Sequence, residues 1–101
     1  GLPVVDDRRR VVGIVTEYDI LKFGMSRILL ESERSKGYRR VRAREIMSTA
    51  VYKVTPNTPL RSVAKIMVEK DIGRVVVVNE KNELIGIVDR EDVVRAYMKY
   101  M

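Results

Sequence analysis

Two short polar motifs stand where an apolar segment gives way to a helical pattern, and their residue types suit ligand binding. Thr16 and Asp19 follow one such segment, and Asp89 and Asp92 follow another. A helix that begins after a strand presents unpaired backbone N–H groups and the positive end of its dipole, which suit a phosphate or another anion. The Thr16 hydroxyl adds a polar group there, and an ionised Asp19 accepts hydrogen bonds from donors such as ribose hydroxyls. The same spacing also fits a capping box, in which the two side chains satisfy the helix's own backbone, so both interpretations stay open.

The residue types that most enzymes use for acid–base or nucleophilic chemistry are scarce. The chain has no histidine and no cysteine, which removes the commonest general base near neutral pH, the commonest metal ligand and all thiolate chemistry. The serines sit in no nucleophile-elbow pattern. The acidic pairs Asp6-Asp7 and Glu91-Asp92 fit a turn and a helix start better than a catalytic pair. The sequence therefore predicts a protein that is not an enzyme and that requires no metal or cofactor.

The formal charge of +6 at pH 7 favours anionic partners, because a basic surface raises the local concentration of phosphates, nucleic acid or acidic membranes. No apolar run approaches the roughly 20 residues that a bilayer span needs, and no signal-peptide pattern is present. We therefore expect one compact, cytoplasmic unit of 101 residues without a membrane segment.

An internal repeat organises the chain. A shift of 73 residues aligns 2–7 with 75–80 and 11–15 with 84–88 without a gap. Each copy predicts a short apolar strand, a charged turn, a second apolar strand and a helix. Because the strands of the second copy are apolar without alternation, we expect both faces of its sheet to be covered and helices to pack over the sheet.

The second copy has two further elements before its hairpin. A strand is expected at 51–55 and an amphipathic helix from about 59 to 70. Thr58 is placed to cap that helix with Pro59 at its first position, and Gly73 is expected to mark its exit. The predicted fold is therefore α+β, a strand-helix-strand-strand-helix repeat in which the second copy is complete and the first is partial.

The chain divides accordingly into a partial first motif at 1–30, a basic linker at 31–40 and a complete second motif at 41–101. Basic residues recur from Arg34 to Arg44 without an acid between them. A charge run is usually a solvated surface, which we favour, but nucleic-acid binding through 34–44 remains an alternative function.

The order and spacing of these motifs resemble the tandem form of the CBS (cystathionine beta-synthase) domain family, the Bateman module. The resemblance is carried by residues 2–6, Gly13-Ile14-Val15-Thr16-Glu17-Tyr18-Asp19, Ile46-Met47-Ser48 and Val54-Thr55-Pro56. It implies two motifs packed sheet to sheet around clefts that bind a regulatory ligand such as AMP, ADP, ATP or S-adenosylmethionine. It also implies a regulated partner protein and, in many members, a dimer. We expect a homodimer here, because Val4, Val5, Val11 and Val12 lack part of the covering that a complete first motif would supply. A scaffold that dimerises without a ligand is the remaining alternative.

The resemblance also implies a set of ligand-binding residues. Asp19 and Asp92 would accept from ribose hydroxyls, while Thr16 and Arg74 would meet the phosphates. Asp89 occupies the place of Thr16 in the second copy, where a carboxylate caps the helix but repels phosphate, so the two half-sites are expected to be complementary rather than equivalent. The remaining ligand-binding positions are those that would lie around the base, together with the proline that follows two of them: Val54, Thr55, Pro56, Gly73 and Val75.

Overall fold

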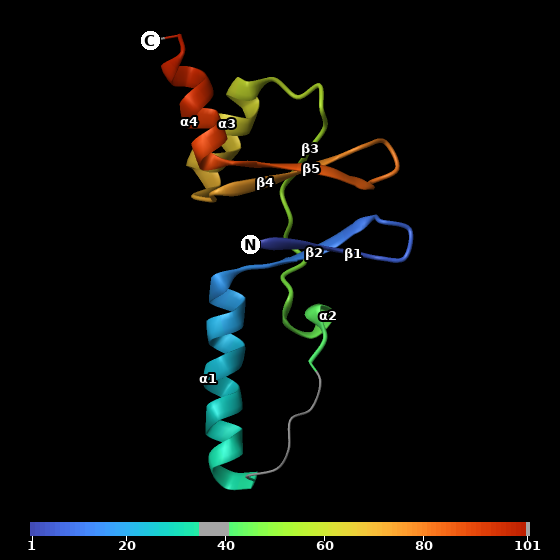
Figure 1. Ribbon diagram of the computed structural model, residues 1–101, viewed down its shortest axis with the longest axis vertical. Helices are drawn as coiled ribbons and strands as arrows, with labels where there is room; N and C mark the ends of the chain where they lie inside the picture. The colour runs from blue at the N-terminus through green and yellow to red at the C-terminus, as the bar shows by residue number, and fades with distance from the viewer. Residues whose placement is uncertain (35–40, 101) are drawn as a thin grey trace.

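The computed structural model describes residues 1–34 and 41–100, with side chains described outside 26–34. Its elements are, in chain order, β1 (Leu2–Val5), β2 (Val11–Val15), α1 (Glu17–Arg34), α2 (Ala43–Ile46), β3 (Lys53–Val54), α3 (Leu60–Lys70), β4 (Arg74–Val78), β5 (Leu84–Asp89) and α4 (Arg90–Met98). They form a two-stranded sheet, β1-β2, and a three-stranded sheet, β3-β4-β5, which Figure 1 shows one beside the other. The predicted α+β fold is confirmed.

The two hairpins are equivalent in register as well as in sequence. Leu2 pairs with Val15 in the first hairpin, and Val75 pairs with Val88 at the same place in the second. In both hairpins the register shifts by one residue at the last pair, so each second strand carries an irregularity one residue after it begins. The strands at 2–5 and 75–78 are therefore the equivalent strands that the repeat predicts.

The turns of the two hairpins are also built alike, although their sequences differ. Asp6 Oδ1 accepts hydrogen bonds from the backbone N–H groups of Arg8 and Arg10, both at 2.9 Å. Asn79 Oδ1 accepts from the N–H groups two and four residues further on, at 3.0 and 2.9 Å. An Asp or Asn side chain that bonds to its own turn in this way fixes the backbone locally.

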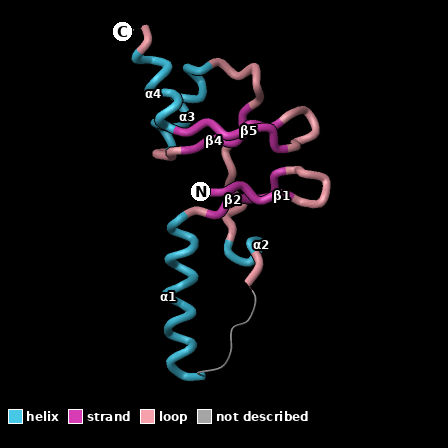
Figure 2. The backbone as a smooth tube through the Cα atoms, in the orientation of Figure 1, coloured by secondary structure: helices cyan, strands magenta, loops and turns pink. Residues whose placement is uncertain are grey.

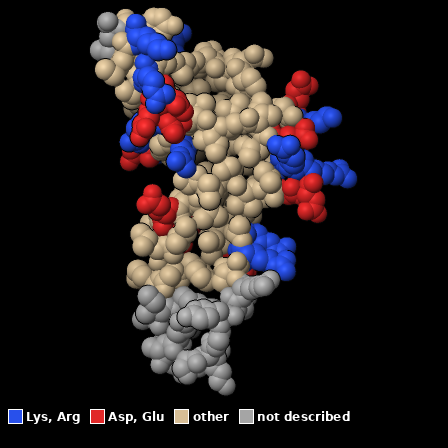
Figure 3. Space-filling model, in the orientation of Figure 1, with Lys and Arg blue, Asp and Glu red and all other residues tan. Residues whose placement is uncertain are grey.

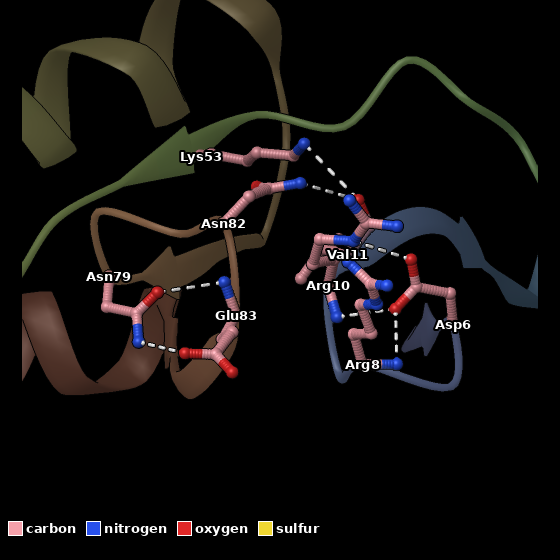
Figure 4. A network of polar contacts seen from close by, with 8 residues as sticks. All are labelled: Asp6, Arg8, Arg10, Val11, Lys53, Asn79, Asn82 and Glu83. Atoms are coloured by element: carbon pink, nitrogen blue, oxygen red, sulfur yellow. Dashed lines mark hydrogen bonds and ion pairs between the residues drawn. The ribbon is translucent and has the colours of Figure 1, made fainter.

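The tips of the hairpins join the two copies (Figure 4). The Val11 N–H donates to the Asn82 carbonyl, and the Leu84 N–H donates to the Arg9 carbonyl, each at 2.9 Å. Arg9 and Asn82 both have a left-handed backbone, with φ of 65° and 64°, and they are equivalent in the repeat. The Asn82 side-chain amide and the Lys53 ammonium also donate to the Val11 carbonyl, at 3.1 and 3.4 Å. The two backbone bonds are equivalent, because the shift of 73 residues that defines the repeat relates the donor and the acceptor of one bond to those of the other. Together they hold the two copies in contact.

The core consists of two apolar layers. One lies between the second sheet and helices α3 and α4, and its buried residues are Val54, Val63, Met67, Val75 and Val93. The other lies between the two hairpins, and its buried residues are Val11, Val76 and Val78. Figure 2 shows α3 and α4 on one side of β4-β5 and the first hairpin on the other.

This layering bears on two expectations. Both faces of β4 are covered, as expected: α3 and α4 pack on one face, and the first hairpin packs on the other, where Val76 is 1% exposed. That cover is incomplete, since Ile85 and Ile87 of β5 stay 52% and 40% exposed. Val11, which we expected to lack covering, is buried against the second copy, whereas Val5 is 40% exposed.

Helix α3 spans the expected range to within one residue, but the residues at its two ends act differently from what was expected. Thr58 does not cap the helix: its hydroxyl oxygen accepts from the Thr55 N–H at 3.0 Å, and no side chain caps at Pro59. The helix ends at Lys70, and its exit is marked by the next residue, Asp71, rather than by Gly73: Asp71 takes the left-handed conformation at φ 51° and donates its N–H to the Met67 carbonyl. The early strand shortens to β3, because only two of its residues pair with β4.

A segment from the chain between the two copies extends the first sheet. The Ile14 N–H donates to the Ser48 carbonyl at 2.9 Å, and the Ser48 N–H donates back to the Ile14 carbonyl at 2.8 Å. A Cβ added at Gly13 would lie 2.8 Å from Met47 Cγ and 3.0 Å from the Ser48 carbonyl oxygen, closer than side chains tolerate. Glycine is therefore required at this strand position for the close approach of residues 47 and 48.

None of the helices within the described ranges combines the length and the apolar character needed to cross a lipid bilayer.

Candidate functional site

A cleft of about 720 Å³ opens between the two copies at the starts of α1 and α4. Its walls come from stretches within 14–19, 48–52, 71–76 and 89–91. Both copies of the repeat therefore contribute, and each contributes the start of the helix that follows its hairpin. This volume is within the range of pockets that hold small ligands.

The first wall is organised by Thr16 and Asp19, which form a complete capping box. Asp19 Oδ2 accepts from the Thr16 N–H at 2.8 Å and from the Thr16 hydroxyl at 2.9 Å. The Asp19 N–H donates back to Thr16 Oγ1 at 3.3 Å. Both side chains are half-buried and both line the cleft. The capping interpretation is thus what the structure shows, and it places the same two side chains at the cleft.

The second wall has the equivalent box, made of two carboxylates. Asp89 Oδ1 accepts from the Asp92 N–H, and Asp92 Oδ2 accepts from the Asp89 N–H, both at 3.1 Å. The pKa of Asp92 is lowered, chiefly by the bond from the Asp89 backbone and further by Arg95, whose Nη1 lies 3.3 Å from Asp92 Oδ1. Asp89 lines the cleft, whereas Asp92 does not.

Two arginines contribute positive charge to the cleft. Arg74 begins β4, and its Nη1 donates to the Gly1 carbonyl at 2.6 Å. Arg90 begins α4, with its Nη2 lying 3.9 Å from Asp71 Oδ1. Both side chains of that second pair are largely exposed, so solvent screens their attraction.

The structure brings half of the predicted site together. The predicted residues that line the cleft are Thr16, Asp19, Gly73, Arg74 and Asp89. Val54 and Val75 are buried in the layer beneath α3 and α4, while Thr55 and Pro56 are exposed beyond the end of β3. Contact of a ligand with these four residues, or with Asp92, stays a prediction.

The cleft also contains residues that the sequence analysis did not assign to the ligand site. Ser48 and Tyr52 reach it from the segment that crosses between the copies, and Tyr18 and Ile72 reach it from α1 and from the loop before β4. Tyr52 is 38% exposed and offers an aromatic surface on which a base can stack. A signal for this segment was present at Gly13, because a glycine within a strand indicates close approach of another backbone.

The basic stretch at 34–44 is described only in part. Residue 34 ends α1, residues 35–40 lie outside the described residues, and Arg42 and Arg44 are exposed at α2. Helix α1 thus continues four residues into the range assigned to the linker.

The CBS domain family matches residues 1–26 and 43–99. The chain belongs to the CBS domain family. The matched ranges contain both copies of the repeat, so the chain is a tandem CBS module, as its motifs indicated.

Solved structures of CBS domain pairs share its fold. The crystal structure of CBSX2 in complex with AMP is 33% identical, has a TM-score of 0.77, and is matched over 98% of this chain and 71% of that one. CBSX2 is a chloroplastic CBS domain-containing protein of Arabidopsis thaliana. The CBS domain pair of MJ0100 in complex with 5′-methylthioadenosine and S-adenosyl-L-methionine is 30% identical, with a TM-score of 0.73, over 99% of this chain and 71% of that one.

Curated relatives include longer proteins. A homoserine O-acetyltransferase of Methanococcoides burtonii is 37% identical over 94 residues, which are 93% of this chain and 17% of that protein. The chain spans less than half of this relative and 43% of the next, a protein of Methanopyrus kandleri. CBS modules thus occur beside other domains.

Proposed function

We propose that this CBS module is a non-catalytic regulatory unit that binds an adenosyl ligand in the cleft between its two motifs. The observation that carries the proposal is the composition of the cleft, in which the helix starts of both copies meet over one cavity. CBS pairs with the same fold have been crystallised with AMP and with S-adenosylmethionine, which supports an adenosyl ligand.

The cleft supplies the kinds of contact that adenosine needs. The Asp19 carboxylate is an acceptor for ribose hydroxyls. Apolar side chains including Ile14, Val51 and Ile72, together with the ring of Tyr52, offer surface for the base. Because these residues belong to both copies, a ligand there would contact both motifs and favour the arrangement in which the walls are close. Such a shift in population is how a non-catalytic module would signal to a regulated partner protein.

We further propose that the module forms a homodimer. Leu21 and Met25 of α1 are each 68% exposed, and the residues equivalent to them in the repeat, Val94 and Met98 of α4, are 50% and 66% exposed. Apolar residues exposed at equivalent places on two helices are typical of an association surface. The proposed division into motifs at 1–30 and 41–101 with a linker at 31–40 places one such helix in each motif.

Calorimetric titration of adenosine into the chain and into an Asp19→Asn variant tests the ligand site. Asparagine keeps a side-chain oxygen for the cap but removes the charge that strengthens a bond to ribose. We expect an affinity about tenfold to a hundredfold lower. The matched control is Asp7→Asn, which makes the same change at an exposed turn position outside the cleft and should leave binding unchanged.

Two results would contradict the proposal. Unchanged affinity in Asp19→Asn would remove Asp19 from the ligand site. If neither adenosine, AMP nor S-adenosylmethionine bound or raised the melting temperature of the unmodified chain, the ligand-free scaffold would become the better interpretation.

A further inference from the structure

The cleft has the opposite charge to the chain as a whole. The chain carries a formal +6, but the cleft is lined by five carboxylates and two guanidiniums, a formal side-chain charge of −3. These residues are Glu17, Asp19, Asp71, Asp89 and Glu91, with Arg74 and Arg90. Figure 3 shows acidic side chains at the starts of α1 and α4, on both rims of the recess between them.

Several of the donors that a phosphate could use at the helix starts already have acceptors. The Thr16 N–H and hydroxyl both donate to Asp19, and the Asp92 N–H donates to Asp89. A carboxylate at a helix start satisfies these groups and offsets the positive end of the dipole. An anion could therefore use these particular groups only by displacing a carboxylate from its own backbone.

The two arginines do not restore a phosphate site. Arg90 is shared with Asp71, which lies on the same rim. This leaves Arg74 as the guanidinium at the cleft without a carboxylate partner within the described residues, while the exposed side chains of Glu17 and Glu91 also line the cleft. A phosphate placed against Arg74 would still be surrounded by more negative than positive charge, whereas a neutral or cationic group would not be repelled.

We propose that the cleft selects adenosyl ligands without a phosphate, carrying an uncharged thioether or a cationic sulfonium at the 5′ position, over adenosine phosphates. This inference rests on the proposed function and specifies its ligand class. The shared adenosine would be bound alike in all cases, and the 5′ substituent would decide affinity through its charge.

The test compares four probes by calorimetry in a buffer of low ionic strength: 5′-methylthioadenosine, S-adenosylmethionine, AMP and ATP. AMP has a net charge of about −2 at pH 7, and ATP carries more. We expect the two sulfur ligands to bind at least about tenfold more tightly than AMP, and ATP to bind more weakly still. Added salt should narrow the difference, because it screens the exposed carboxylates.

A double variant, Glu17→Gln with Glu91→Gln, removes two cleft charges without touching either capping box. It should raise the affinity for AMP severalfold and leave that for 5′-methylthioadenosine unchanged. The matched control is Glu69→Gln with Glu80→Gln, which removes the same charge from exposed positions outside the cleft. It should leave the ratio of the affinities for 5′-methylthioadenosine and AMP unchanged.

The outcomes separate this inference from the function on which it rests. Binding of AMP or ATP as tight as that of 5′-methylthioadenosine would overturn the selection and leave the adenosyl site standing. An equal gain for AMP in both double variants would show that overall charge decides, and would also overturn it. Binding of none of the four probes would refute the proposed function, and the inference with it.

Discussion

Substituting alanine at Gly13 and at Gly86 makes one chemical change at two equivalent places with opposite expected results. Each glycine is the third residue of the second strand of its hairpin, and the two hairpins have the same register. Neither glycine has a positive φ. They differ in what lies beside them. Residues 47 and 48 press against Gly13, whereas the nearest atom to a Cβ added at Gly86 is Val77 Cβ at 4.0 Å.

The magnitude follows from those distances. At Gly13 the new methyl group would lie 3.0 Å from the Ser48 carbonyl oxygen, a backbone atom that cannot rotate away as a side chain does. Overpacking of this kind costs about 1–3 kcal/mol. Alanine also recovers about 0.5–1 kcal/mol over glycine by reducing the entropy of the unfolded chain. Gly13→Ala should therefore lose up to about 2.5 kcal/mol of unfolding free energy, while Gly86→Ala should gain about 0.5–1 kcal/mol.

Urea denaturation followed by circular dichroism measures both values, with equal m-values required for the comparison. Gly13→Ala should also weaken adenosine binding, because the displaced Ser48 lines the cleft. If the two variants were equally stable, the close packing of residues 47 and 48 on β2 would be refuted, and with it the reason for a glycine at position 13.

Three further predictions follow from the turns, the cleft and the helices. The pKa of Asp6 is lowered, first by the Arg10 backbone N–H and also by the Arg8 N–H and the Arg10 side chain. The charged carboxylate therefore stabilises the fold above the usual pKa near 3.8, and this contribution is lost as the pH falls below that value. Asp6→Asn, which copies Asn79, keeps the acceptor oxygen of the turn but removes the charge. It should therefore be less stable than the unmodified chain near pH 7 and lose less stability on acidification, so that the two chains converge in denaturation series from pH 7 to 2. Arg74→Ala should lower the affinity for AMP about tenfold and leave the affinity for adenosine unchanged, as measured by calorimetry. An equal loss of affinity for both ligands would count against a contact between Arg74 and the phosphate. Met25→Glu with Met98→Glu should convert the expected dimer to a monomer in sedimentation at micromolar concentration, and an unmodified chain that sediments as a monomer would contradict the dimer itself.

The repeat made the hairpins predictable to the level of residue pairing. A gapless shift requires equal strand and turn lengths, so Val4 pairing with Gly13 implies Val77 pairing with Gly86, as observed. The capping at the starts of α1 and α4 could also be predicted from the sequence, because its hydrogen bonds join residues only three positions apart and do not depend on the rest of the fold. Both capping boxes are of this kind.

Contacts between the copies could not be predicted, because they join residues far apart in the chain. Periodicity shows that Val11 is apolar but not that a second hairpin buries it. The same applies to Ser48 and Tyr52, which enter the cleft because the crossing segment pairs with β2 and then with β4. The strand expected at 51–55 is shorter because its outer residues bond locally: the Val51 N–H donates to the Thr49 carbonyl, and the Thr55 N–H donates to the Thr58 hydroxyl.

The bonds between the hairpin tips have the symmetry of a contact between identical subunits. Each tip presents a strand N–H and a left-handed carbonyl, and each receives the same pair of groups from its equivalent. A surface that is complementary to an identical copy of itself is called isologous, and such surfaces form the twofold interfaces of homodimers. One copy of the hairpin therefore holds all the backbone groups needed to associate with itself. In the tandem chain this self-association takes place within one molecule, so it does not depend on protein concentration.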